Sequence, residues 1–307
     1  MDVVGFGENS IDYLYRLPGL PAGGAGALGS GKVHVEGRTV LPGGQVATTM
    51  AACAALGLRT AYAGSFGNDE GAALVRRELT SRGVDLGHAV GREAPNRYAV
   101  ILVDAASGER VVLWDRDDRL RSNPGEGRAE WLAGTRARHG DGVDEAASIV
   151  LARLGRTAGL HVTSDIETLT PSTAELIAAV TVPIFAEHVP AALTGLADPE
   201  QALRAIRRTH DGMLVVTLGA RGAMLLHGDT LHHEPAVPVD VVDTTGAGDV
   251  FRAGLIHALL EGLPPRELLR FANAAAAVSC TRAGAMSSVP SLADVQRLLA
   301  PMTTKTV

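Results

Sequence analysis

One glycine-punctuated stretch that ends in a carboxylate is well suited to chemistry in this 307-residue sequence. It reads D-T-T-G-A-G-D-V-F over residues 243–251, and apolar residues at helical spacing follow it. Gly246 and Gly248 let a ligand approach the backbone, and the free N–H groups of a helix start bind anions such as phosphate. Asp249 would then lie where it can take the proton of an alcohol that attacks this phosphate. The alternative is an ordinary strand-turn-helix corner in which Asp249 only caps the helix.

The elements that would position this stretch alternate along the chain. Short apolar runs of strand length are separated by stretches whose apolar residues recur every three or four positions, which predicts an α/β fold with a mostly parallel sheet and helices on both faces. Ligands then bind at the carboxyl ends of the strands. The predicted strands are 3–6, 61–64, 147–150, 160–163, 182–185, 213–217 and 224–226, and the predicted helices are 45–56, 71–82, 173–179, 199–209 and 268–280.

Two segments, residues 12–41 and 95–116, do not fit this alternation. The second contains two apolar runs, 98–103 and 110–114, with the turn residues Ser107-Gly108 between them. That pattern predicts a β-hairpin. With 46% apolar residues, the chain is long enough to bury the core of one large domain.

The stretch at 243–251 resembles the signature of the PfkB/ribokinase family, which reads roughly D-T-T-G-A-G-D-x-F. Further similarities to that family follow in its order over nearly the whole chain, at residues 4–12, 42–47, 56–57 with 64–71, 216–222 and 271–276. The resemblance implies a ribokinase-like three-layer α/β sandwich over residues 1–307, a single kinase domain. In that family, segments matching 12–41 and 95–116 form a small β-sheet lid.

The resemblance also implies an activity, the ATP-dependent transfer of a γ-phosphoryl group to a primary hydroxyl of a small sugar. Asp249 would be the general base, and the backbone N–H groups of Gly246, Ala247 and Gly248 would hold the phosphate. Because Asp249 lies near a helix N-terminus, we expect its carboxylate to be ionised at neutral pH.

The two substrates are expected on opposite sides of this turn. On the sugar side, Asp12 is expected at the end of the first strand. Many relatives have an asparagine at the position of Thr48, so the identity of the sugar is left open. The residues that match sugar-binding positions are Asn9, Asp12, Gly43, Gly44, Gln45 and Thr48. Those that match nucleotide-binding positions are Thr217, Gly219, Gly222, Ala272, Asn273 and Ala276, although alanines on a helix also serve close packing.

Cations are a further expectation from the resemblance. A monovalent cation, K⁺, would be held beside the signature turn, and Mg²⁺ would accompany ATP. The residues that match the monovalent cation site are Asp243, Thr245 and Ser288. The N-x-x-E motif that many relatives use in the magnesium and phosphate network is absent, because Ala186 and Val189 occupy its two positions. Glu187 lies between them and could act on Mg²⁺ through water.

The identity of the acceptor is open. Ketohexokinases and sulfofructose kinases are similar in lacking N-x-x-E, and the Ala-Ser-Gly-Glu-Arg sequence at 106–110 also resembles them, which favours a ketose. Arginines near the lid either read an anionic substituent or are solvated surface charges; they are Arg97, Arg110, Arg116 and Arg119. The alternatives are a nucleoside kinase, which the 4% aromatic content disfavours, and a pseudokinase that senses a sugar or nucleotide without turnover.

Composition excludes other classes of protein. A net charge of −6 without a basic run disfavours nucleic acid, and no apolar stretch is long enough to cross a bilayer. We expect a cytoplasmic protein with buried, reduced thiols at Cys53 and Cys280, and a homodimer formed through the lid. Residues 26–33 nearly spell a P-loop, but Val33 replaces the hydroxyl that binds Mg²⁺.

Overall fold

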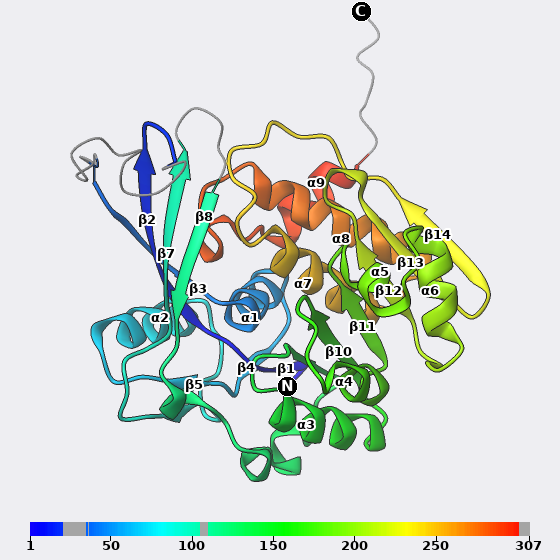
Figure 1. The fold of residues 1–307 in the computed structure, drawn as a ribbon, viewed down its shortest axis with the longest axis horizontal. Helices are drawn as coiled ribbons and strands as arrows, with labels where there is room; N and C mark the ends of the chain where they lie inside the picture. Colours follow the sequence, from blue (N-terminus) through cyan, green and yellow to red (C-terminus); the bar gives the residue numbers. More distant parts are fainter. Residues whose placement is uncertain (21–34, 36, 105–109, 301–307) are drawn as a thin grey trace, which may run out of the picture.

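The computed structural model describes residues 1–20, 35, 37–104 and 110–300 (Figure 1). The predicted turn at Ser107-Gly108, most of the 106–110 similarity and the P-loop-like residues 26–33 lie outside this description, as does the side chain of Arg110.

A central sheet carries the fold, with strand order β14-β13-β12-β11-β10-β9-β1-β4. Neighbours from β4 to β12 are parallel, and β13 and β14 are antiparallel additions at one edge. The predicted mostly parallel sheet is therefore confirmed. The strands are β1 (Val3–Phe6), β4 (Thr60–Tyr62), β9 (Ala137–Gly140), β10 (His161–Ile166), β11 (Val182–Phe185), β12 (Leu214–Thr217), β13 (Ala223–His227) and β14 (Thr230–Glu234).

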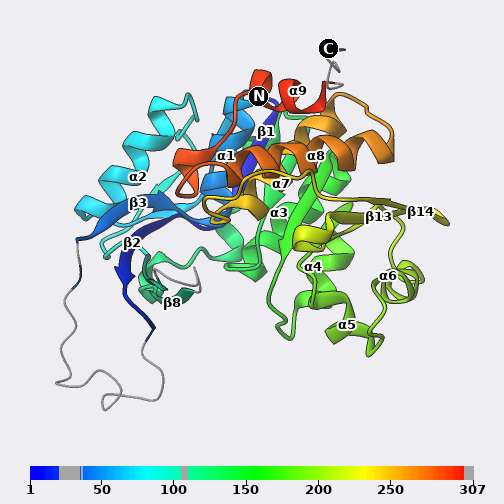
Figure 2. The same ribbon diagram turned by 90° about the horizontal axis from the view of Figure 1, so that it is seen from above.

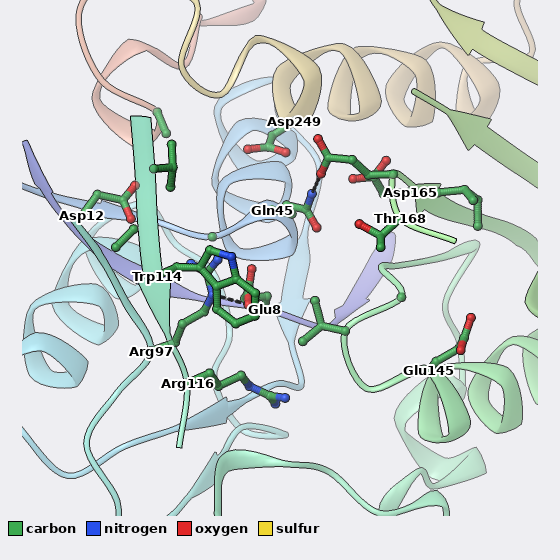
Figure 3. A pocket seen from close by; sticks show the side chains of 18 of the residues that line it. Glu8, Asp12, Gln45, Arg97, Trp114, Arg116, Glu145, Asp165, Thr168 and Asp249 are labelled. Carbon is green, nitrogen blue, oxygen red and sulfur yellow. Dashed lines mark hydrogen bonds and ion pairs between the residues drawn. The ribbon is translucent and has the colours of Figure 1, made fainter. Parts of the chain in front are cut away.

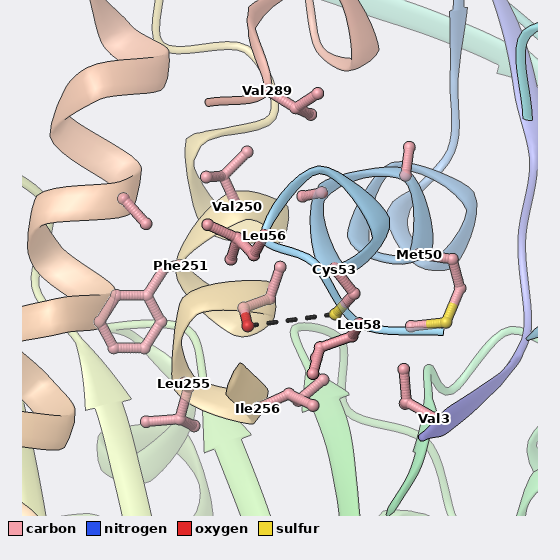
Figure 4. Close-up of a cluster of buried hydrophobic side chains, with 14 of the residues drawn as sticks. Val3, Met50, Cys53, Leu56, Leu58, Val250, Phe251, Leu255, Ile256 and Val289 are labelled. Atoms are coloured by element: carbon pink, nitrogen blue, oxygen red, sulfur yellow. Dashed lines mark hydrogen bonds between the residues drawn. The ribbon is translucent and has the colours of Figure 1, made fainter. Parts of the chain in front are cut away.

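Helices cover both faces of this sheet (Figure 2). On one face, α7 packs against both α1 and α8. Figure 4 shows Val250, Phe251, Leu255 and Ile256 of α7 in the apolar cluster that Cys53 of α1 joins. On the other face, α3, α4 and α6 pack on β10, β11 and β12. The helices are α1 (Gln45–Ala55), α2 (Glu70–Ser81), α3 (Glu145–Thr157), α4 (Thr173–Ala179), α5 (Val189–Thr194), α6 (Pro199–Arg207), α7 (Ala247–Leu260), α8 (Pro265–Cys280) and α9 (Leu292–Leu299).

A separate four-stranded sheet stands beside the central sheet, with strand order β3-β2-β7-β8 (Figure 1). Its strands are β2 (Ser10–Leu17), β3 (Thr39–Gly43), β7 (Tyr98–Asp104) and β8 (Arg110–Asp115). The antiparallel pair β7–β8 is the predicted hairpin. Strand β8 is the sheet edge and exposes apolar side chains, with Leu113 54% and Trp114 64% exposed. A two-stranded sheet joins β5 (Ser65–Phe66) to β6 (Val90–Gly91).

Two predictions about these elements are wrong, and one strand is missing from the predictions. Residues 147–150 belong to α3 instead of a strand, because a short apolar run looks the same in a buried helix. The strand β9 was not predicted, because its inward residues include Arg138 and His139, which are fully buried and hydrogen-bond Ser148 and Thr163. Asp12 lies in β2 of the small sheet, not at the end of the first strand.

Among the described residues, none of the helices combines the length and the apolar character that a bilayer-spanning segment requires.

Candidate active site

Two cavities meet at the N-terminus of α7. The first has a volume of about 640 Å³ and lies between the small sheet and the carboxyl ends of the central strands. The second, of about 510 Å³, lies between the loop after β14 and α8. The first contains the predicted residues Asp12, Gly44, Gln45, Gly246 and Asp249 (Figure 3), and the second contains Thr217, Gly219, Gly222, Ala247, Gly248, Asn273 and Ala276.

The start of α7 needs its glycines. Gly246 caps the helix with φ 78°, a left-handed conformation that favours glycine, and α7 has no side-chain cap. A Cβ at Gly246 would lie 2.8 Å from the Cα of Ala285, and one at Gly248 would lie 2.9 Å from an Arg252 guanidinium nitrogen. The Ala247 N–H donates to the Thr244 carbonyl at 3.2 Å. The turn therefore has no room for a side chain at Gly246, and its residues line both cavities.

Asp249 is held in a buried ion pair. Arg252, one turn later on α7, donates from Nη1 to Asp249 Oδ1 at 3.0 Å and from Nη2 to Asp165 Oδ1. Burial raises the pKa of Asp249 well above its usual range, and the positive charge of Arg252 opposes this rise. The raised pKa runs against the expectation that Asp249 is ionised at neutral pH, whereas the positive charge of Arg252 favours the ionised form.

Two carboxylates at the end of β10 line the first cavity without having been predicted. Asp165 is 2% exposed, and Glu167 accepts a hydrogen bond from Nε2 of Gln45. Their signal in the sequence is an acid-x-acid pattern directly at a strand end, the edge where parallel sheets bind ligands. In Figure 3, Asp165, Gln45 and Asp249 gather on one side of the cavity.

The predicted sugar residues divide into two groups. Asp12 faces the cavity and accepts a hydrogen bond from Ser10 Oγ at 2.7 Å, while a Cβ at Gly43 would collide with the Asp12 carboxyl. Asn9 does not line the cavity, because its amide is buried and donates to Tyr62 at 2.9 Å and to the Ser65 carbonyl at 2.6 Å. Thr48 is fully buried and also lies outside the cavity lining.

The arginines near the small sheet differ in their surroundings. Arg97 forms a largely buried ion pair with Glu8, and its guanidinium carbon lies 5.4 Å from the centre of the Trp114 ring. Arg116 makes two hydrogen bonds, of 2.9 and 2.8 Å, to Asp144.

Both Arg97 and Arg116 line the first cavity, so the interpretation as solvated charges is wrong for these two. Arg119 is 63% exposed, pairs with Asp117 and fits that interpretation. Burial raises the pKa of Glu8 to about 8, although Arg97 lowers it.

The second cavity is bordered by α8. Asn273 donates from Nδ2 to the carbonyls of Glu234 and Pro235, at 2.9 and 3.1 Å, and so holds the loop after β14. Ala272 lies outside the cavity lining, because it packs against Gly254 of α7. Cys280 is half-buried and lines the cavity, so the prediction of a buried thiol is wrong for Cys280, whereas Cys53 is buried.

Two of the predicted monovalent cation residues, Asp243 and Thr245, are hydrogen-bonded to each other, and Ser288 bonds a neighbouring loop. Asp243 accepts bonds from the N–H and Oγ1 of Thr245, at 2.8 and 2.7 Å, and from the N–H of Gly284 at 2.8 Å. Ser288 is buried, and its hydroxyl donates to the Ala285 carbonyl at 2.9 Å. Glu187 pairs with Arg221 and lines neither cavity.

Two cavities that meet at a helix start carrying a carboxylate are an arrangement that suits a kinase of small molecules, because a helix N-terminus can bind a phosphate. The sequence matches the model of the pfkB family carbohydrate kinases over residues 3–292. The chain therefore belongs to the pfkB family of carbohydrate kinases, which confirms the resemblance.

Several relatives match over most of their length. The chain is 30% identical to aminoimidazole riboside kinase of Salmonella typhimurium over 277 residues, which are 81% of this chain and 85% of the relative. It is 26% identical to fructokinase-1 of Oryza sativa over 97% of both chains. A match to ribokinase of Lactococcus lactis, 38% identical over 101 residues, spans only 34% of that relative.

A solved structure shares the fold. Arabidopsis thaliana ribokinase, complexed with ribose and ATP, superposes with a TM-score of 0.85 and 25% sequence identity over 98% of this chain and 99% of its own. The predicted ribokinase-like fold is thereby confirmed.

Proposed function

We propose that the protein transfers the γ-phosphoryl group of ATP to a primary hydroxyl of a small sugar, either a ketohexose or a ribose-like sugar. One observation carries the proposal, the carboxylate of Asp249 at the junction of the two cavities. The first cavity takes the sugar and the second takes the nucleotide. The relatives support these two substrate classes, since they include fructokinases and ribokinases.

The sugar is held between the small sheet and α1. The carboxylate of Asp12 accepts hydrogen bonds from sugar hydroxyls, and Ser10 and Gly43 keep that carboxylate in place. Gly44 and Gln45 line the same wall, with the buried Asn9 behind the Gly44 backbone. Trp114, at the cavity edge, offers an apolar ring face to the carbons of a sugar. Thr48 supports this wall from within α1.

Phosphoryl transfer takes place at the start of α7. The backbone N–H groups of Gly246 and Gly248 are assigned to the negative charge that develops on the phosphoryl oxygens, where preorganised donors stabilise a transition state, whereas the N–H of Ala247 is used by the Thr244 carbonyl. Asp249 accepts the proton of the attacking hydroxyl, and the positive charge of Arg252 favours the ionised form of Asp249 that this task requires. Water is excluded when sugar and nucleotide fill the two cavities.

The nucleotide lies along β12 and α8. Thr217, Gly219 and Gly222 form the loop wall of the second cavity, and Asn273 and Ala276 form its helix wall. Ala272 contributes through the packing of α8 on α7. We assign this cavity to ATP because its lining is mainly small and apolar and it opens at the anion-binding turn.

The proposal also includes two cations, Mg²⁺ and K⁺. Mg²⁺ bound to the nucleotide neutralises its phosphates. Potassium is assigned to the loop of Asp243, Thr245 and Ser288, where turn carbonyls offer oxygen ligands.

The association state and location are proposed from the surface. The exposed apolar edge strand β8 fits pairing with the same strand of a second copy, which would form a homodimer through the small sheet. We place the protein in the cytoplasm, with no nucleic-acid or membrane partner.

The test is ADP formation from MgATP, with and without K⁺, in the presence of fructose, ribose, tagatose, sulfofructose, sugar phosphates or adenosine. Turnover that depends on a free sugar supports the proposal. Turnover only with adenosine would make the protein a nucleoside kinase. Nucleotide binding without turnover on any acceptor would contradict the proposal and support a sensor, the function that the missing N-x-x-E motif favours.

A further inference from the structure

Strand β10 and the residue after it place two carboxylates in the first cavity, which also contains Asp249. Asp165 is the next-to-last residue of β10, and Glu167 directly follows the strand. Both line the cavity that Asp249 also lines. Arg252 donates to both Asp249 and Asp165, so one guanidinium joins these two carboxylates.

Asp165 has one carboxylate oxygen that no described residue hydrogen-bonds. Its Oδ1 accepts from Arg252, but Oδ2 is buried and has no hydrogen-bond partner among the described residues. A buried carboxylate oxygen without a partner is costly, so native proteins pair such atoms with protein groups, water or an ion. Because Asp165 lines the cavity, its free oxygen indicates a ligand or bridging water there.

The charge balance at this point calls for a cation. Asp165, Glu167 and Asp249 carry three negative charges when ionised, and Arg252 supplies one positive charge. The polyphosphate of a nucleotide must approach the same place, yet no lysine or arginine is among the described residues that line the second cavity. A divalent ion with oxygen ligands resolves this repulsion, and Mg²⁺ needs only one or two carboxylates besides phosphate oxygens and waters.

The loop at the N-x-x-E positions contributes no carboxylate to the lining of either cavity. Val189 is fully buried, and Ala186 has no ligand atom in its side chain. Glu187 is 54% exposed and paired with Arg221, away from both cavities.

We infer that Glu167 and Asp165 hold the magnesium ion that accompanies the nucleotide, with Glu167 as the accessible ligand and Asp165 acting through water. The inference rests on the proposed use of a metal-bound nucleotide. The described residues contain no cluster of three or more acidic, histidine or cysteine side chains suited to a metal. The ion is therefore expected to bind together with the nucleotide and not alone.

The experiment measures Mn²⁺ binding by electron paramagnetic resonance, with Mn²⁺ replacing Mg²⁺, in the presence of ADP and without a sugar. The variant is Glu167→Gln, and the matched control is Glu187→Gln. We expect Glu167→Gln to weaken Mn²⁺ binding in the ADP complex by about tenfold to a hundredfold. The control should bind Mn²⁺ as the native protein does, and ADP binding in the presence of EDTA should be equal in all three proteins.

Asp165→Asn serves as a second variant, with its melting temperature recorded because Asp165 pairs with the buried Arg252. Weaker Mn²⁺ binding in a folded Asp165→Asn protein supports the inference. Unchanged binding in Glu167→Gln, or a loss confined to Glu187→Gln, would overturn it. Because no sugar is present, this result is independent of whether any sugar is phosphorylated.

Discussion

Replacing Arg252 with methionine should raise the pKa of Asp249 and shift the pH dependence of activity. Arg252 lies 3.0 Å from Asp249 and is 7% exposed. Two unit charges about 4 Å apart interact by about 4 kcal/mol at an effective dielectric constant of about 20. An arginine beside an aspartate commonly lowers the carboxyl pKa by about 1 to 3 units. Losing Arg252 should therefore raise the pKa of Asp249 by a similar amount.

The assay is kcat/KM for the best acceptor from about pH 6 to about pH 9.5, because the free-enzyme pKa of a general base appears in this ratio. The methionine variant should lose about tenfold to a thousandfold at the acid end of this range. The loss should shrink as the pH rises, since a higher pH ionises Asp249 again.

Controls separate this effect from damage to the fold. Arg252→Lys keeps the charge and should retain most of the native pH profile. Arg252→Met leaves the buried carboxylate of Asp165 unpaired, which costs about 3 to 5 kcal/mol of stability, so the melting temperature of the variant is recorded and its kinetics are measured where it is folded. A loss of equal size at every pH in a folded variant would refute the idea that Arg252 sets the ionisation of Asp249.

Further predictions concern stability and the second cavity. Burial raises the pKa of Glu8 from its ordinary 4.5 to about 8, so the folded protein binds this proton more tightly than the unfolded chain does. The melting temperature should therefore fall as the pH rises from about 4.5 to about 8. Glu8→Gln should flatten this fall, and an equal fall in the native protein and the variant would contradict the prediction. Ala276→Leu should raise the KM for ATP without lowering the melting temperature. Ala272 packs against α7, so Ala272→Leu should lower the free energy of unfolding by about 1 to 3 kcal/mol and leave the KM unchanged. The reverse pattern would contradict the assignment of the second cavity to ATP. Gly246→Ala should cost at least about 1 to 2 kcal/mol in urea unfolding, because φ 78° disfavours a Cβ, and a neutral effect would contradict this.

Elements with a strong apolar pattern could be predicted from sequence. Helix α4 and strand β11 have the predicted bounds, because turn residues or polar residues delimit each apolar run. Strand β9 could not be predicted, since Arg138 and His139 occupy buried positions through hydrogen bonds to residues elsewhere in the chain. Propensity and periodicity contain no information about such partners.

The candidate site, too, could be predicted from the sequence only in part. The turn from Gly246 to Asp249 was readable because its residue types and spacing determine what its backbone can do. The pairing of Arg252 with Asp165 spans 87 positions and depends on how α7 packs over β10. Asn9 was predicted to contact sugar, but it is buried behind Gly44, because sequence order does not reveal which way a side chain points.

The most direct test of the central proposal is single-turnover phosphoryl transfer by Asp249→Asn on the best acceptor, with nucleotide binding measured in parallel. If Asp249 is the base, the variant should bind MgATP as the native protein does and transfer the phosphoryl group about 10² to 10⁴ times more slowly. Transfer at the native rate by a folded, nucleotide-bound variant would contradict the role of Asp249.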